Sequence, residues 1–379
     1  MAGIGVWCFA LPKQNLTMTG KNGKPRANEL RLVAWETTRR CNLDCVHCRA
    51  SSSRGPYPGE LGEDKGREIL RQIAGAGNPI IILTGGEPLL REDIFRLAQF
   101  GTGLGLRMVM ATNGTMVTPE IARMMQNSGI KRVSISIDGA NAADHDRFRK
   151  VPGAFEGALR GIEILKKAGI AFQINTTVTR HNARQIDKIL KMAVDMGAVA
   201  HHIFLLVPTG RARDMVNQEI DAREYEKLLH WFYDMREAVP LHLKATCAPH
   251  YYRILRQEAL RKGEKVDYDT YGLDAVTRGC LGGISFCFIS HDGIVQPCGY
   301  LEQKAGDLKE SPFGQIWEHS ALFETLRNHA AYKGKCGRCE YLRFCGGCRA
   351  RAFEATGDYM SEEPLCMYQP QRKQKAGEA

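Results

Sequence analysis

Three cysteines near the start of the chain have the spacing of a metal-cluster loop. Cys41, Cys45 and Cys48 form a C-x3-C-x2-C pattern in the segment CNLDCVHC. Three thiolates can bind three corners of a cubane iron–sulfur cluster, which leaves one iron open. An open coordination position is typical of a catalytic metal rather than a structural one. The alternative is a zinc site with His47 as fourth ligand, but His47 lies between two of the cysteines in a tight loop.

Eight further cysteines form a second group in the last third of the chain. They fit two sites of four ligands each, and their short spacings are typical of iron–sulfur or zinc ligands rather than of disulfides. The eight are Cys280, Cys287, Cys298, Cys336, Cys339, Cys345, Cys348 and Cys366. Spacing alone does not exclude a zinc ribbon built from the two Cys-x2-Cys pairs. Cys8 and Cys247 belong to neither group. An isolated cysteine of this kind is more often an inert buried side chain than a metal ligand.

The composition restricts the class of protein. The chain has 379 residues, 44% hydrophobic residues and a net charge of +10. No apolar run reaches the roughly 18 residues that span a bilayer, and the start lacks the features of a signal peptide. We therefore expect a cytoplasmic protein with reduced thiols. The basic residues are scattered, which argues against nucleic acid and leaves open a small ligand that bears several carboxylates.

The elements that must position these residues alternate between strand and helix. Strands are predicted at 32–37, 80–84, 107–112, 132–137, 171–178 and 200–207, and helices at 63–74, 91–100, 119–128, 154–168 and 183–196. This alternation predicts parallel βαβ units, which form an open sheet or an incomplete barrel. Either architecture binds ligands at the carboxyl ends of its strands, and the first cysteine loop follows the first strand.

The pattern changes after about residue 208. Helices are predicted at 222–237, at 250–262 and near 313–328, among short strands and glycines. The predicted organisation is a lead-in (1–30), a partial barrel (31–240), a bridge (241–274), a cluster domain (275–370) and a tail (371–379). A region so poor in long apolar elements is expected to gain stability from metal clusters.

The cysteine loop and its companions resemble the radical S-adenosylmethionine (SAM) superfamily. The companions are Thr-Gly-Gly-Glu-Pro after the second strand, Ala-Thr-Asn-Gly after the third, and Ser-Ile-Ser-Ile-Asp on the fourth. The resemblance implies an α/β fold, an incomplete (β/α)6 barrel similar to a TIM barrel. It also implies that the open iron binds SAM, which is cleaved to a 5′-deoxyadenosyl radical. The SAM contacts that it implies are Gly85, Gly86, Glu87, Pro88, Asn113, Ser134, Ser136, Asp138, Arg149, Asn175, Thr177, Leu205 and Leu206.

The C-terminal cysteines resemble the SPASM extension of many radical SAM enzymes. That extension holds two auxiliary 4Fe–4S clusters, so the resemblance implies three clusters in all. One auxiliary cluster would take Cys280, Cys287, Cys298 and Cys348, and the other Cys336, Cys339, Cys345 and Cys366. The run Cys345-Gly-Gly-Cys348 has two intervening residues where the common family run has three, which leaves a single auxiliary cluster as an alternative.

Local segments such as HIFLLVPTGRA and LKATCAPHYYRILRQ resemble the haem b synthases of the alternative, sirohaem-dependent haem pathway. This resemblance implies oxidative decarboxylation of two propionates of iron-coproporphyrin III to vinyl groups, with an external reductant of the ferredoxin or flavodoxin type. An auxiliary cluster is a plausible acceptor for the surplus electron. Candidate propionate ligands are Arg211, Arg213, Lys244, His250, Tyr251, Tyr252 and Arg253, and His201 and His202 are weaker candidates for the haem iron.

Rival interpretations remain at this stage. Another tetrapyrrole-modifying enzyme or a peptide maturase would share the architecture, although residues 1–30 are too short for the peptide-recognition segment that maturases usually carry. A non-catalytic iron–sulfur carrier or zinc scaffold would not need a three-cysteine site with these companions.

Overall fold

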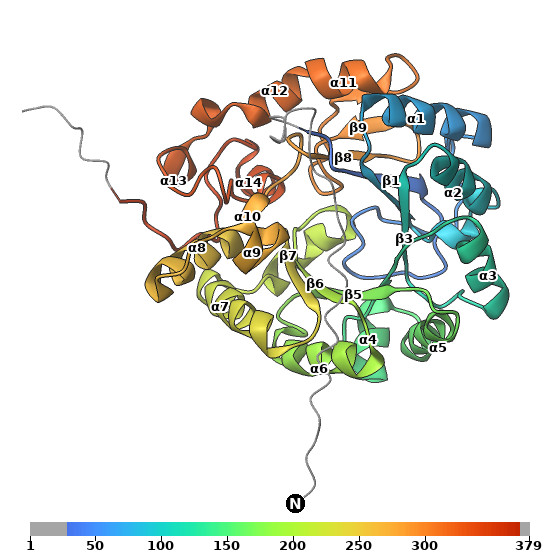
Figure 1. The fold of residues 1–379 in the computed structure, drawn as a ribbon, viewed down its shortest axis with the longest axis horizontal. Helices are drawn as coiled ribbons and strands as arrows, with labels where there is room; N and C mark the ends of the chain where they lie inside the picture. Colours follow the sequence, from blue (N-terminus) through green and yellow to red (C-terminus); the bar gives the residue numbers. More distant parts are fainter. Residues whose placement is uncertain (1–28, 372–379) are drawn as a thin grey trace, which may run out of the picture.

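The computed structural model describes residues 29–371. The predicted lead-in up to residue 28, the tail from residue 372 and Cys8 lie outside the described residues. The part described is an α/β fold in which helices surround a curved, ten-stranded sheet (Figure 1).

The sheet is parallel over most of its width. Its strand order is β10-β9-β8-β1-β2-β3-β4-β5-β6-β7, and all pairings from β8 to β7 are parallel. Strands β9 and β10 add an antiparallel edge beside β8. The strands are β1 (Leu32–Thr38), β2 (Ile80–Gly85), β3 (Arg107–Thr112), β4 (Val133–Ser136), β5 (Phe172–Val178), β6 (Ala200–Leu205), β7 (His242–Thr246), β8 (Phe286–Ile289), β9 (Ile294–Gln296) and β10 (Gly306–Asp307).

The helices of the barrel are α1 (Glu63–Ala76), α2 (Ile94–Gly103), α3 (Pro119–Asn127), α4 (Ala142–Arg149), α5 (Ala154–Lys167), α6 (Ile186–Met196), α7 (Ala222–Ala238) and α8 (His250–Lys262). Short helices follow: α9 (Tyr268–Tyr271), α10 (Leu273–Val276), α11 (Phe313–His319), α12 (Ala321–Arg327), α13 (Gly334–Gly337) and α14 (Arg349–Thr356). Among these, α11 packs against α1, so the C-terminal region lies along the β1 side of the barrel (Figure 1).

The six predicted strands all form, but the sheet is wider than predicted. Strand β7 pairs with β6 and lies in the predicted bridge, and β8 pairs with β1 and lies in the predicted cluster domain. The segment of β7 carries His242 and Lys244 in place of an apolar, β-branched run, so it did not predict a strand. Strand β8 is one of the short strands expected in its region, but its pairing with β1 was not predicted. Helix α4 was also not predicted, and the helix expected near 313–328 is divided at Ser320 into α11 and α12.

Strand alternation separates a helix-packed face from an inner face. On β1, Val33 and Trp35 are fully buried in the main apolar core, and Trp35 contacts Gly66 of α1. Glu36, the residue after Trp35, points to the inner face, where it pairs with Arg49. On β4 to β7 the inner face is polar and half-buried, in contrast to the apolar face beneath the helices. The sheet therefore presents a partly open polar wall to a ligand.

Within residues 29–371 we find no helix that combines the length and the apolar character needed to span a membrane.

Candidate active site and cluster-binding cysteines

The three N-terminal cysteines lie together in the loop that follows β1. Cys41 and Cys45 are buried with Leu43 and Ala154, and Cys48 packs against this group. The sulfurs accept N–H bonds from the chain around them: Leu43 N to Cys41 Sγ and Ser52 N to Cys48 Sγ, both 3.4 Å. Burial raises the pKa of Cys41 to about 12. Three converging thiols in a dry loop with N–H donors fit a cluster held at three corners.

Close backbone packing fixes this loop against the end of β2. A Cβ atom on Gly85 would lie 2.2 Å from Thr38 O, and one on Gly86 would lie 2.3 Å from Arg40 O. The N–H groups of Gly86 and Glu87 donate to those same two carbonyls at 2.8 and 2.7 Å. The two glycines are therefore required by contact with the cysteine loop, whereas the sequence suggested close contact with a ligand.

Glu87 and Asn113 extend the support to the end of β3. Glu87 is fully buried and accepts from Thr112 Oγ1 at 2.7 Å and from Asn113 N at 2.8 Å. The Asn113 amide donates to Asn42 in the cysteine loop at 2.8 Å. Burial raises the pKa of Glu87, although these donors oppose the shift. In this structure Glu87 thus ties strand ends together.

Arg149, at the end of α4, lies directly beside the cysteine loop. Its guanidinium forms an ion pair with Asp138 and contacts Cys45 Sγ at 3.5 Å. Asp138 also accepts from Thr177 N at 2.7 Å, so the ends of β4, β5 and α4 meet at one point. Both ionic side chains are at least nine-tenths buried. A cation at this place, next to the first cluster loop, can bind a carboxylate.

His47, the fourth ligand in the zinc alternative for the first loop, packs against other side chains. The ring of His47 stacks on Phe148 with a centroid distance of 4.2 Å, and its Nε2 lies 3.9 Å from Asp138 Oδ2. Zinc holds sulfur ligands at about 2.3 Å, which needs sulfurs roughly 3.8 Å apart. Among residues 29–371, no three Cys, His, Asp or Glu side chains gather closely enough for one metal ion. Cluster ligands stand farther apart than ligands of a single ion.

The remaining predicted SAM contacts fall into two groups. Ser134, Ser136 and Asn175 lie half-buried on β4 and β5, and Asn175 accepts from Gln173 at 2.9 Å. Leu205 and Leu206 are buried at the end of β6, where their carbonyls accept from Arg351 at 3.4 and 2.9 Å. The β6 end is therefore bound to the C-terminal region in this structure. Pro88 begins the short turn that follows Glu87.

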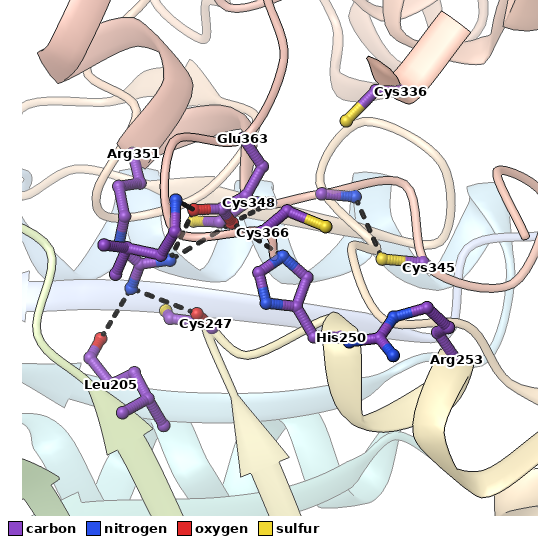
Figure 2. Close-up of polar contacts among 12 residues, drawn as sticks. Leu205, Cys247, His250, Arg253, Cys336, Cys345, Cys348, Arg351, Glu363 and Cys366 are labelled. Atoms are coloured by element: carbon purple, nitrogen blue, oxygen red, sulfur yellow. Dashed lines mark hydrogen bonds and ion pairs between the residues drawn. The ribbon is translucent and has the colours of Figure 1, made fainter. Parts of the chain in front are cut away.

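Four C-terminal cysteines line one pocket. Cys336, Cys339, Cys345 and Cys366 surround it together with His250, Arg253 and Tyr368. Figure 2 shows Cys336, Cys345 and Cys366 around the same space. These are the four cysteines that the sequence assigned to one auxiliary cluster, and the structure brings them together.

The short Cys345–Cys348 run still separates two sites. Gly346 and Gly347 both adopt left-handed backbone, with φ of 77° and 60°. Two consecutive left-handed residues turn the chain sharply, and only glycine does so without strain. Cys345 consequently lines the four-cysteine pocket, whereas Cys348 packs with Val207 and Leu301. The missing residue thus does not prevent the two cysteines from serving different sites.

Three of the other four predicted ligands are neighbours. Burial raises the pKa of Cys298 to about 12, and the nearby thiols of Cys280 and Cys348 raise it further by electrostatic repulsion. Cys287 is placed elsewhere: it is fully buried on β8, opposite Val33 of β1, in the main apolar core. The structure does not bring Cys287 together with the other three.

A buried ion pair joins the barrel to the cysteine array, and sequence reasoning missed it. Arg351 is 1% exposed and pairs with the fully buried Glu363 at 3.2 Å. Its guanidinium also donates to the carbonyls of Leu206 and Cys247, while Glu363 accepts from Cys348 N (Figure 2). The sequence carried no signal beyond two charged residues in a cysteine-rich segment.

Comparison with known proteins agrees with this architecture. Residues 35–193 match the radical SAM superfamily, and residues 280–340 match SPASM, an iron–sulfur cluster-binding domain. Streptococcus suis SuiB bound to S-adenosylmethionine has the same fold, with a TM-score of 0.70, 16% identity, and coverage of 90% of this chain and 78% of SuiB.

Relatives with far higher identity narrow the family. An AdoMet-dependent heme synthase of Nitratidesulfovibrio vulgaris is 54% identical over 96% of this chain and 98% of its own length. The AdoMet-dependent heme synthase of Methanosarcina barkeri is 52% identical over 91% of this chain and 99% of its own length. The chain belongs to the AdoMet-dependent heme synthase family. It is thus a radical SAM enzyme that uses SAM and 4Fe–4S chemistry, and its SPASM domain binds additional iron–sulfur clusters.

For a heme synthase, the placement of the seven substrate candidates matters. Arg211 donates to Cys45 O at 2.8 Å and to Ser52 O at 2.7 Å, so it holds the cysteine loop. Arg213 lies 3.7 Å from Glu354 at the surface. Arg253 pairs with Glu226 at 2.6 Å.

The candidates in α8 are largely structural. Tyr251 and Tyr252 are buried in the main core, where Tyr251 packs edge-on to Phe232. His250 lies 3.6 Å from Glu363. His201, proposed for the haem iron, is also buried and contacts Thr176 Oγ1 at 3.0 Å.

Lys244 is the candidate that lies on the polar inner wall. It is half-buried on β7, next to His202 of β6 in the strand register. Burial lowers the pKa of Lys244, and the carboxylate of Asp274 opposes this shift. Burial holds the pKa of His202 well below its usual value, and its neighbours Lys244, His242 and Arg132 lower it further. Burial also lowers the pKa of His242 to about 4, so that Lys244 and Arg132 carry the positive charge of this part of the inner wall.

Proposed function

We propose that this heme synthase converts two propionates of iron-coproporphyrin III to vinyl groups and so produces haem b. The observation that carries the proposal is identity of 52–54% to AdoMet-dependent heme synthases over almost the whole length of both chains. The three-thiol loop, the buried Arg149 and the polar inner wall supply the parts that such a reaction needs. A net charge of +10 suits a substrate that carries four propionates.

The chain's own residues bind and orient the reactants. When bound, SAM and a cluster held by Cys41, Cys45 and Cys48 would supply the radical chemistry that removes a hydrogen atom from a propionate β-carbon. Loss of carbon dioxide would then give the vinyl group, and the one surplus electron would pass to an auxiliary cluster held by the C-terminal cysteines. Arg149 would bind the SAM carboxylate; its buried position beside Cys45 and its ion pair with Asp138 support this role. Lys244 would pair with a propionate, and its half-buried position on the inner wall supports this role.

The setting that we propose follows from this chemistry. The reactant is a free tetrapyrrole, and the electron donor is an external one-electron carrier of the ferredoxin or flavodoxin type. The reducing cytoplasm keeps the twelve described cysteines out of disulfides, so that they are available as cluster ligands.

Anaerobic incubation tests the substrate directly. The reconstituted enzyme is mixed with SAM, dithionite and iron-coproporphyrin III, and the products are analysed by mass spectrometry. We expect two successive losses of a formic acid equivalent, with one 5′-deoxyadenosine formed per loss. A Cys45→Ser variant is the control for chemistry that does not depend on the first cluster.

A parallel arm separates related activities. An Fe-coproporphyrin III synthase of Methanosarcina barkeri is 30% identical and a pre-heme d1 synthase of Dinoroseobacter shibae is 34% identical. The same assay is therefore run with didecarboxysirohaem. Turnover of that compound without any decarboxylation of iron-coproporphyrin III would overturn the proposal.

A further inference from the structure

A cysteine that the sequence left without a role lies beside the incomplete set of ligands. Cys247 follows β7 directly, at the carboxyl end of the barrel, and its side chain packs against the buried cluster that contains Cys348. Cys298 packs against the same apolar cluster, which contains Cys348, Val207 and Leu301. Cys280 lies beside the turn that leads to Cys348: its N–H donates to Cys345 O at 3.0 Å, and a Cβ on Gly346 would lie 3.6 Å from Cys280 Cβ. Four separate segments of the chain therefore bring thiols to this region.

The backbone at Cys247 indicates that its direction is imposed. Its φ is 54°, in the left-handed region, where a residue other than glycine is uncommon. Such a conformation is strained in a residue with a Cβ atom and persists where the surroundings determine it. Here the carbonyl of Cys247 accepts from Arg351 at 3.2 Å, which helps to fix the turn that directs the thiol toward Cys348 (Figure 2).

Cys287 faces the opposite way. On β8 the neighbouring Phe288 lies under the Arg49 guanidinium at 4.3 Å, and Arg49 in turn contacts Gly299, next to Cys298. Because side chains alternate along a strand, Cys287 points to the other face of the sheet. Its charged neighbour there is Arg327 of α12. Cys287 therefore belongs to the apolar layer between sheet and helices.

From this placement we propose that Cys247 is the fourth thiolate of the auxiliary cluster formed with Cys280, Cys298 and Cys348, and that Cys287 is a core residue. Eleven cysteines still serve three clusters as 3 + 4 + 4, with Cys247 in place of Cys287. One ligand then comes from the barrel itself, so this cluster ties the end of β7 to the C-terminal extension. Each thiol gives up its proton when it binds iron.

The test compares two substitutions in the full-length protein after anaerobic reconstitution. Cys247→Ala removes the proposed ligand, and Cys287→Val removes the other thiol while keeping an apolar side chain of similar size. Iron, acid-labile sulfide and the EPR spectrum of the reduced protein are measured. Wild type should contain about twelve irons from three cubanes.

We expect Cys247→Ala to lose about four irons, or to keep them with a changed EPR signal from one auxiliary cluster. Cys287→Val should have the same iron content and the same EPR spectrum as wild type. SAM binding and far-UV circular dichroism control for the first cluster and for folding, and Cys247→Ser repeats the test with a more conservative change.

Loss of a cluster from Cys287→Val would overturn the proposal, and so would unchanged iron and an unchanged spectrum in both Cys247 variants. No tetrapyrrole is present in these measurements. Their outcome is therefore independent of whether iron-coproporphyrin III is the substrate.

Discussion

The loop of Cys41, Cys45 and Cys48 and the array around Cys348 place their sulfurs by different means. The loop is one continuous segment, and neighbouring strand ends hold its backbone: Gly86 and Glu87 donate to its carbonyls, and Arg211 donates to Cys45 O. The array gathers thiols from distant segments, and the buried Arg351–Glu363 pair joins it to the barrel.

This difference has a functional consequence. A loop held by its backbone can leave one coordination position free for a ligand, because its shape does not depend on a fourth thiolate. An array of separate segments depends on its ligands and on the ion pair for its shape. We therefore expect the first site to lose chemistry when changed, and the array to lose both chemistry and stability.

The largest effect is expected at the loop. Cys45→Ser should abolish SAM cleavage, because the first cluster needs all three thiolates to keep its open iron. The C-terminal clusters should remain, so the iron content should fall by about four rather than to zero. Chromatography of 5′-deoxyadenosine and iron analysis measure the two quantities. Normal yields of 5′-deoxyadenosine would show that the open site lies elsewhere.

Cys298→Ala tests the array's part in the proposed reaction. If its cluster accepts the surplus electron, the variant should still cleave SAM but produce little vinyl product, with hydrogen returned or a substrate radical trapped. The ratio of vinyl product to 5′-deoxyadenosine, with SAM binding as control, measures this uncoupling. A wild-type ratio would mean that the electron leaves by another route.

The ion pair between barrel and array should matter next. Arg351→Met leaves Glu363 charged and buried, which costs about 3–5 kcal/mol of folding free energy. Urea unfolding of the reconstituted protein measures the loss. Lys191→Met is the matched control, because Lys191 and Asp195 form an exposed pair within one helix, worth about 0.3–0.5 kcal/mol. If both substitutions lowered the free energy of unfolding equally, the Arg351–Glu363 pair would not be what holds the array against the barrel.

A substitution at Arg211 tests whether this residue supports the cysteine loop or binds the substrate. Arg211→Ala removes two bonds to carbonyls of the loop, each worth about 1.5–3 kcal/mol for a charged donor. Without any tetrapyrrole present, its capacity for SAM cleavage should decay faster than wild type under a chelator, whereas Arg213→Ala should decay at the wild-type rate. If Arg211 served the substrate instead, only the KM for tetrapyrrole would rise.

The same difference explains what the sequence could predict. The first loop was predictable because its three ligands lie within eight residues after an apolar strand, and the six strands were predictable from β-branched runs. The placement of Cys287 was not, because its spacing resembles the family pattern while strand alternation on β8 directs its side chain into the apolar core. Strand β7 carries His242, Lys244 and Thr246 in place of a β-branched run, so Cys247 had no predicted element to place it.

The smallest effect is expected at the inner wall of the barrel, away from both cysteine sites. Lys244 lies next to the neutral His202 on this wall, with Asp274 as its carboxylate neighbour. A propionate would gain a charged hydrogen bond there, worth about 1.5–3 kcal/mol. Lys244→Gln should therefore raise the KM for iron-coproporphyrin III by about tenfold or more, with iron content and SAM cleavage unchanged.

Lys244→Arg keeps the charge and should recover most of this affinity. Arg253→Gln is the comparison, because Arg253 already pairs with Glu226 and its loss should lower stability rather than raise KM. If Lys244→Gln left KM unchanged, the polar wall would not be the surface that meets the propionates. The substrate would then have to lie nearer the rim, between the first loop and the end of β7 that carries Cys247.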